Sequence, residues 1–300
     1  MNALRFLAAR VCVTGMLLVG INATSGAQTS HNEPPGHAHV VVAPTATDGH
    51  VAKLLAATKA AAAGFRDRRA AVAAGYRRIG PDVPSMGEHW INPRHVVADT
   101  FDVTEPALLT YIKVEGRPVL TGVVYAAPLA FGQSPPAIFG RNAVWHEHNG
   151  TLDEEALLPD HHTAPSAAKG MRLSILHAWL WSPNPQGMFA TENWTIPFLR
   201  LGLVPPRTFP ESAARAVSLL SGSEYYLNLA GAGFSGTVEP ILTGCAARAD
   251  RITKRARDGD RILTHNEVET LSLAWTESVL AIAKVSGKDV ARRLNGGRMP

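Results

Sequence analysis

Three β-rich runs in the middle of the chain constrain its fold more than any other feature. Residues 108–114 and 119–125 are mostly large aliphatic and β-branched, and Glu115-Gly116-Arg117-Pro118 separates them. Two such runs joined by a short polar turn predict an antiparallel hairpin. In the third run, 171–181, large side chains recur at every second position, which is the period of a strand. They are Met171, Leu173, Ile175, His177, Trp179 and Trp181.

Helical patterns flank this region on both sides. From Val51 onward, apolar residues recur at helical spacing as far as Tyr76, with Gly75 and Gly80-Pro81 expected to end the helix. Beyond about residue 205, helices are expected at 211–220 and 238–257. Thr264-His265-Asn266-Glu267 fits a capping box that opens a last helix, whose predicted buried residues are Val268, Leu271, Trp275, Val279 and Ile282. The predicted class is α+β: an antiparallel β-sheet core with an N-terminal amphipathic helix and a helical C-terminal segment.

The first 27 residues have the pattern of a cleavable signal peptide. Arg5 and Arg10 precede an apolar stretch at 11–21, and Ser25-Gly26-Ala27 offers small residues at a cleavage site. No later stretch approaches the length of a membrane span, so no integral membrane segment is expected after cleavage. We therefore expect a soluble periplasmic or secreted protein. Its predicted parts are a flexible His- and Pro-containing tail (28–47), an α+β core domain (48–204) and a helical C-terminal region (205–300).

The charge balance excludes one class of partner. The whole chain has a formal charge of +4, and the leader holds two of its 29 basic residues and none of its 25 acidic ones. Without the leader, basic residues exceed acidic ones by only two. This surplus is too small to form an electrostatic footprint for nucleic acid. With Cys12 in the leader, Cys245 has no partner for an intrachain disulfide, and it is expected to be a small buried residue. The partner is left as an unidentified small molecule or protein.

Histidines are the most promising functional residues. His146 and His148 are two positions apart, so on a strand both would lie on one face while Glu147 points the other way. The His-x-His spacing suits chelation of a divalent transition metal such as zinc or copper, because imidazole is a good ligand for both. An exposed polar strand would give the same pattern.

Two further histidines occupy apolar surroundings. His89 follows Glu88 and precedes Trp90, and His177 lies on the most apolar strand face of the chain. Each alone is more typical of a hydrogen-bonded core histidine than of a ligand, but a buried neutral imidazole is also the form that binds metal. We predict that His89, His146, His148 and His177 converge on one metal site, with Glu147 as an additional candidate ligand.

Two other function classes are left open. A metal-dependent enzyme would keep three ligands and an open coordination position, although the nucleophile-elbow, P-loop and His-Glu-x-x-His motifs are absent from the sequence. A metal-free module could instead bind its ligand or partner in an apolar groove formed by Trp145, Trp179, Trp181 and Trp194. Whether the chain catalyses a reaction is not decided by the sequence.

Two stretches together resemble a family of uncharacterised secreted bacterial proteins. They are Met86-Gly87-Glu88-His89, which matches a Met-Gly-x-His motif, and residues 177–189, which match His-x-Trp-x-Trp…Asn-Pro-x-Gly-Met-Phe. The resemblance covers residues 75–195 and places His89 and His177 in the two motifs. The chain departs from the pattern in Glu105-Pro106-Ala107-Leu108, where the family has Pro-Glu-x-Leu, and in Glu192-Asn193-Trp194, where it has Asp-Trp-Asn-Pro. It also continues about 100 residues further.

Overall fold

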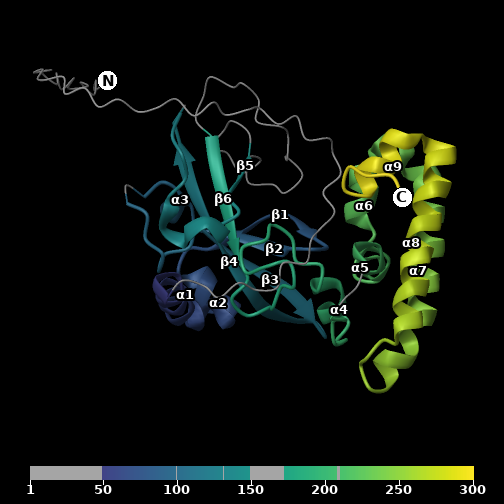
Figure 1. Cartoon of the computed structure of the whole chain (residues 1–300), viewed down its shortest axis with the longest axis horizontal. Helices are drawn as coiled ribbons and strands as arrows, with labels where there is room; N and C mark the ends of the chain where they lie inside the picture. Colours follow the sequence, from purple (N-terminus) through teal and green to yellow (C-terminus); the bar gives the residue numbers. More distant parts are fainter. Residues whose placement is uncertain (1–48, 99, 131, 149–171, 208–209) are drawn as a thin grey trace, which may run out of the picture. The chain divides into compact units, whose positions relative to one another are not determined.

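The structure is a computed structural model that describes residues 49–98, 100–130, 132–148, 172–207 and 210–300 (Figure 1). The predicted signal peptide and the predicted tail at 28–47 lie outside these residues. All described residues belong to one compact unit, His39–Pro300. The division predicted at 204/205 stays a prediction, although the last described strand ends at Ala178 and helices dominate from Ile196 onward.

The described residues form a six-stranded antiparallel sheet together with helices, which confirms the predicted α+β class. The strand order is β1-β2-β3-β4-β6-β5. The predicted hairpin is present as β3 and β4, with Glu115 and Gly116 at positive φ in the two-residue turn, as a tight hairpin requires. The strands are β1 (Arg77–Val83), β2 (Gly87–Ile91), β3 (Leu108–Val114), β4 (Arg117–Leu129), β5 (His146–His148) and β6 (Arg172–Ala178).

The sequence analysis did not predict β1 and β2. Gly80-Pro81 was expected to end a helix, but β1 runs through both residues. Proline has no backbone N–H to donate to a neighbouring strand. An edge strand tolerates proline because one of its sides is unpaired. The strand order places β1 at the edge of the sheet, and this position explains why a helix-breaking pair lies within a strand.

Short N-terminal helices cover one face of the sheet. The segment expected as a single helix forms α1 (Gly49–Ala61), the 3₁₀ helix η1 (Ala62–Arg66) and α2 (Arg68–Ala73). The break falls at Asp67, whose backbone is extended and whose carboxylate accepts a hydrogen bond from the Arg69 N–H to cap α2. Val51 and Leu55 of α1 pack with Tyr111 and Tyr125 of the sheet in one buried cluster.

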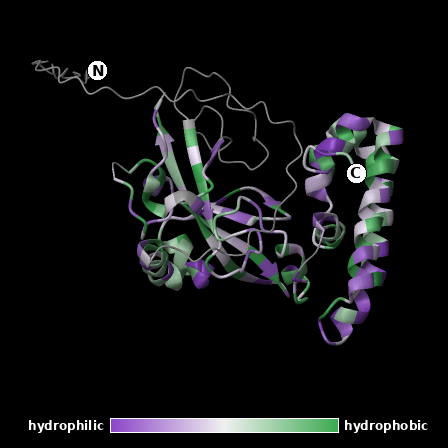
Figure 2. Cartoon of the chain, viewed as in Figure 1, coloured by the Kyte–Doolittle hydropathy of each residue, from purple (hydrophilic) through white to green (hydrophobic). Residues whose placement is uncertain are grey.

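The opposite face of the sheet carries a separate apolar cluster. Ile91, Leu108, Val124 and Ile175 come from four different strands and pack there with residues near the short helix α3 (Pro93–Val96). Cross-strand partners share a face, and the pairs Ile91–Leu108 and Leu108–Val124 put these residues on one side. In Figure 2 the short strand β5 is hydrophilic, whereas the neighbouring β6 is largely hydrophobic.

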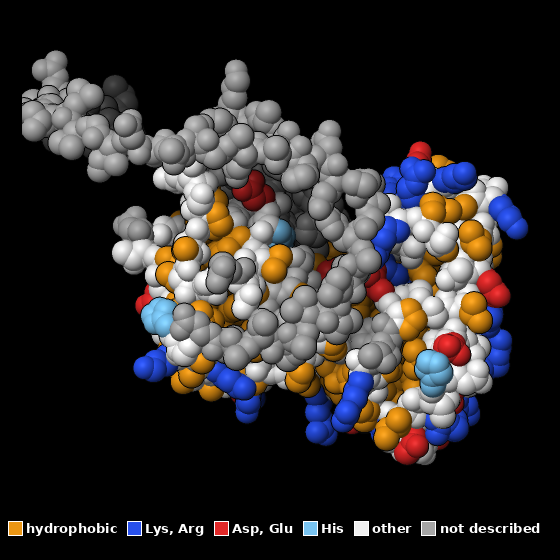
Figure 3. Space-filling view, viewed as in Figure 1, with side chains coloured by type: hydrophobic (Ala, Val, Ile, Leu, Met, Phe, Trp, Pro, Cys, Tyr) orange, Lys and Arg blue, Asp and Glu red, His pale blue; other side chains and the backbone are white. Residues whose placement is uncertain are grey.

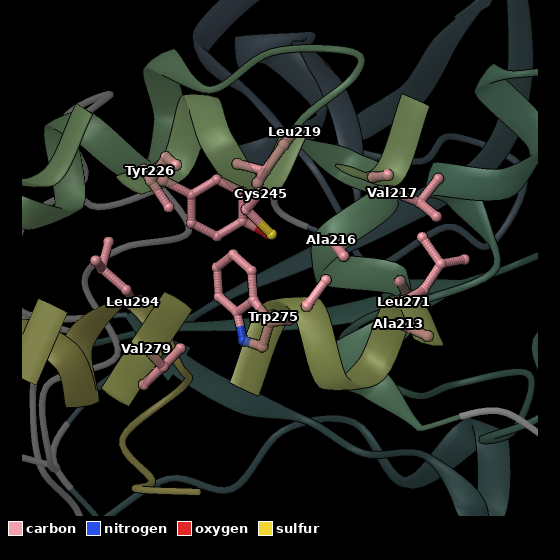
Figure 4. Close-up of a cluster of buried hydrophobic side chains, with 14 of the residues drawn as sticks. Ala213, Ala216, Val217, Leu219, Tyr226, Cys245, Leu271, Trp275, Val279 and Leu294 are labelled. Carbon is pink, nitrogen blue, oxygen red and sulfur yellow. The ribbon is translucent and has the colours of Figure 1, made fainter. Parts of the chain in front are cut away.

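The C-terminal helices form a core of their own (Figure 4). The capping box at Thr264 and Glu267 is present, and all five residues predicted to be buried on the helix that follows are buried, which confirms that prediction. Cys245 is buried in the same core. The elements are α4 (Ile196–Arg200), α5 (Glu211–Ser218), α6 (Glu224–Ala230), η4 (Ala232–Phe234), α7 (Ser235–Asp258), α8 (His265–Ser286) and α9 (Lys288–Leu294).

A buried arginine connects distant parts of the chain within this core. Arg215 of α5 lies over the Trp194 ring, with its guanidinium carbon 4.3 Å from the ring centroid. It donates a hydrogen bond of 3.0 Å to the Leu294 carbonyl and pairs with Glu211. A buried guanidinium is tolerated only when it is paired and hydrogen-bonded. Trp194, which precedes α4, is thereby held against the end of α9.

None of the helices in the described part of the chain combines the length and apolar character needed to cross a membrane. On the face in Figure 3, acidic and basic side chains are interspersed over the C-terminal helices. The absence of a nucleic-acid partner stays a prediction.

Candidate functional site

Three of the predicted histidines come together at the sheet. The His177 ring on β6 lies 5.8 Å from the His89 ring on β2 and 5.6 Å from the His146 ring on β5, measured between centroids. The rings of His177 and Trp179 are also 5.6 Å apart. His177 is thus the middle member of a row of imidazoles from three different strands.

The curvature of the sheet makes this meeting possible. Two strands, β3 and β4, separate β2 from β6, so three strand spacings of about 4.8 Å would hold the backbones about 14 Å apart in a flat sheet. Rings 5.8 Å apart therefore require the sheet to curl toward the histidine face. Gly122 on β4 lies within the curl, where an added Cβ would be 2.7 Å from the Ala178 carbonyl oxygen.

Register explains why the three side chains share a face. His89 pairs with Thr110, which pairs with Gly122 on β4. Two residues further along β4, Val124 pairs with His177. Positions two apart on a strand point to the same side, so His89 and His177 lie on one face. His146 pairs with Ile175, two residues before His177, and joins the same face.

The site is buried and mostly apolar. His89 and His177 are each only 4% exposed, and His146 is half-buried. The Nδ1 atoms of all three rings are inaccessible to solvent. Ile91, Val124 and Ile175 of the apolar cluster described above lie on the same face. Such surroundings favour the neutral form of an imidazole.

The two remaining predicted metal ligands, His148 and Glu147, are not placed like the three histidines. His148 pairs with Leu173 on β6, but its side chain lies outside what the structure describes. Glu147 pairs with Ser174 and lies between the two histidines on β5, so its side chain faces the opposite side of the sheet. The structure therefore brings together His89, His146 and His177, and it directs Glu147 away from them.

Glu88, which precedes His89, has a structural environment of its own. Its carboxylate is 3% exposed and forms ion pairs with Arg68 at 3.3 Å, Lys113 at 3.4 Å and Arg78 at 3.5 Å. It also accepts a hydrogen bond of 3.2 Å from the Trp90 indole. Glu88 therefore lies on the face of β2 opposite His89, where three cations surround its carboxylate and give it a structural role.

The ring spacing is close to that of metal-bound imidazoles. With Zn–N bonds of about 2.1 Å and tetrahedral angles, the centres of two coordinated rings lie about 5 Å apart. The observed spacings of 5.6 and 5.8 Å are slightly wider. Within the described residues, no three His, Cys, Asp or Glu side chains are grouped so that they could hold a metal ion as they stand. Coordination of one ion by all three rings would therefore need their side chains to rotate.

The four tryptophans of the alternative groove are divided among separate clusters. Trp179 is buried beside Met86 and Ile196, whereas Trp194 is buried in the core of the C-terminal helices. Trp145 and Trp181 pack, half-buried, against the cluster beneath the N-terminal helices. These placements do not produce a single Trp-lined groove.

A second polar group, which no sequence pattern indicated, surrounds His95. Its Nδ1 is 3.1 Å from the Pro106 carbonyl oxygen and 3.3 Å from the Tyr76 hydroxyl. Its Nε2 is 3.2 Å from the Asn92 amide nitrogen, which donates to it. The Tyr76 hydroxyl donates to the same Pro106 carbonyl at 2.7 Å. A lone histidine in Asn-Pro-Arg-His gave no spacing signal, and only the return of the chain at Pro106 creates this arrangement.

Comparison with known proteins adds no further constraint: no family model, curated protein or solved structure matches the chain significantly. The resemblance carried by the Met-Gly-x-His and His-x-Trp-x-Trp motifs stays a prediction.

Proposed function

We propose that this protein binds a divalent transition metal, zinc or copper, through the imidazoles of His89, His146 and His177. The observation that supports the proposal is the row of three rings with centroids 5.6 and 5.8 Å apart. The three residues are far apart in sequence, and they meet only because the sheet curls.

The surroundings favour metal binding chemically. An imidazole must be neutral to coordinate a metal, and burial disfavours its protonated form. Three imidazoles form a ligand set that suits zinc, copper, iron and nickel. A fourth position would be filled by water, by an external ligand or by His148, the next residue of the His-x-His pair on β5. Three ligands with an open position would permit catalysis, whereas four closed ligands would favour storage or structure.

The primary test is equilibrium dialysis of the purified, untagged protein against zinc and against copper. We expect one equivalent of metal to bind tightly. His177→Asn and His89→Asn should each weaken binding by about 10- to 100-fold or more, the range known for losing even a supporting group of a metal site. The matched control is His265→Asn, because His265 on α8 has an 87% exposed side chain and pairs only with the nearby Glu269.

Each outcome bears directly on the proposal. Far-ultraviolet circular dichroism of each variant separates loss of a ligand from loss of the fold. Absence of tight binding in the wild-type protein would refute the proposal. So would binding that survives both substitutions in folded variants, since the metal would then be held elsewhere. X-ray absorption of the loaded protein should show at least three nitrogen neighbours at about 2.0–2.1 Å for zinc.

A further inference from the structure

A cavity separate from the histidine row lies between the loop that follows α3 and the end of β4. Its volume is about 420 Å³, within the range of small-molecule sites. One wall is formed by described residues between 95 and 107, and the other by described residues between 125 and 136. His95 lies in the first wall.

The charged groups of this cavity are all of one sign. Asp102 and Glu105 line it, and no lysine or arginine does so among the described lining residues. The Thr104 backbone N–H and hydroxyl both donate to Asp102 Oδ1 at 2.7 Å. These bonds lower the pKa of Asp102, so its carboxylate is charged at neutral pH. The ring nitrogens of His95 lie 3.1 Å from the Pro106 carbonyl oxygen and 3.2 Å from the Asn92 amide nitrogen.

Aromatic residues also line this cavity. Phe101 and Tyr125 line the cavity, and their ring centroids are 5.5 Å apart. The Tyr125 hydroxyl is used elsewhere, in hydrogen bonds with Thr58 and with the Val103 carbonyl. Tyr125 is only 1% exposed and its ring also packs against Phe139, so the exposed ring at the cavity is that of Phe101. The negative face of an aromatic ring attracts cations, so this ring and the two carboxylates favour the same kind of ligand.

We infer that this cavity binds a small organic cation bearing an ammonium group. The ligand class follows from two carboxylates and the exposed Phe101 ring around a cavity of about 420 Å³. An anionic ligand would face uncompensated repulsion from Asp102 and Glu105. This inference is independent of the proposed metal site, because none of its residues belongs to the histidine row.

The test compares two probes of nearly equal shape. Choline carries the charge, and 3,3-dimethylbutan-1-ol is its neutral counterpart. We expect choline to bind about tenfold more tightly, in a titration followed by the choline methyl resonance, with an upfield shift from the Phe101 ring. Its affinity should fall as salt rises, because the carboxylates are near solvent.

Variants identify the groups responsible. Asp102→Asn keeps the acceptor for Thr104 and removes the charge, so choline affinity should fall about threefold, as for a partly exposed ion pair. Glu105→Gln should act in the same direction, and neither change should affect the neutral probe. Phe101→Leu should reduce the methyl shift. Asp289→Asn, in an exposed carboxylate of α9, is the matched control.

Several results would overturn the inference. They are absence of saturable choline binding, equal affinity for the two probes, tighter binding of butyrate than of choline, or choline binding that is unchanged in both acid variants. A folded Glu105→Gln protein keeps the test decisive if Asp102→Asn does not fold.

Discussion

The glycine of the Met-Gly-x-His segment permits a sharp prediction about stability. Gly87 begins β2 at φ +92°, a conformation that side chains rarely adopt. A Cβ added there would lie far inside van der Waals contact with the Tyr111 carbonyl oxygen and 3.1 Å from Cγ2 of Ile112. Because the first of these atoms is backbone of the paired strand, a side-chain rotation cannot relieve the contact. We predict that Gly87→Ala strongly destabilises the protein.

The magnitude follows from two contributions. A non-glycine residue held at such a φ costs about 1–3 kcal/mol. Forcing β2 and β3 apart in a packed region costs about 1–3 kcal/mol more. We therefore expect the free energy of unfolding to fall by about 2–6 kcal/mol, which corresponds to roughly 4–24 °C in Tm for a chain of this size.

The assay is urea unfolding followed by circular dichroism, and Gly116→Ala is the matched control. Gly116 also has a positive φ, of +76°, but no atom lies within 4 Å of an added Cβ. Its substitution should therefore cost only the conformational contribution. A Gly87→Ala loss below about 1 kcal/mol, or one equal to that of Gly116→Ala, would show that the close strand approach is not needed.

Two further substitutions test charged groups. Glu88→Gln should lower the free energy of unfolding by about 1–2 kcal/mol in urea titrations, because its three cationic partners are 33–54% exposed and each pair contributes little; an unchanged midpoint would contradict this. In Glu267→Gln, loss of the Arg255 ion pair should cost about 0.5–1 kcal/mol at neutral pH. Hydrogen bonds from Arg255 and Thr264 lower the pKa of Glu267 from 4.5 to about 2, so its stabilisation is complete above pH 4.5. The difference from wild type should vanish as pH falls toward 2, and a difference constant across that range would be incompatible with it.

Local sequence signals predicted local structure well. The helix after Thr264 was found because a capping box and a stripe of apolar residues agree at consecutive turns. The β3–β4 hairpin was found because two β-rich runs flank a short polar turn that contains glycine. In both cases the interactions that determine the element lie within about 20 residues, so sequence alone contains them.

Features that depend on contacts between residues far apart in the chain were harder to predict from the sequence. β2 was missed because its polar residues, Glu88 and His89, are buried for different reasons on opposite faces. Glu88 is buried among cations from α2, β1 and β3, while His89 meets His177 across the curl of the sheet. Spacing could suggest the pair on β5 but not the distance between β2 and β6. That distance depends on sheet curvature, which no local pattern encodes.

The guanidinium of Arg215 has a consequence for when folding can finish. One face of it rests on Trp194, and its Nη1 donates to the carbonyl of Leu294, 79 residues later in the chain. During synthesis, the segment before α4 is complete long before its partner on α9 exists. Until α9 is made, the guanidinium has Glu211 as an acceptor but not the Leu294 carbonyl. The helical core can therefore close fully only once α9 is available, which makes its closure a late event that joins residues far apart in the sequence.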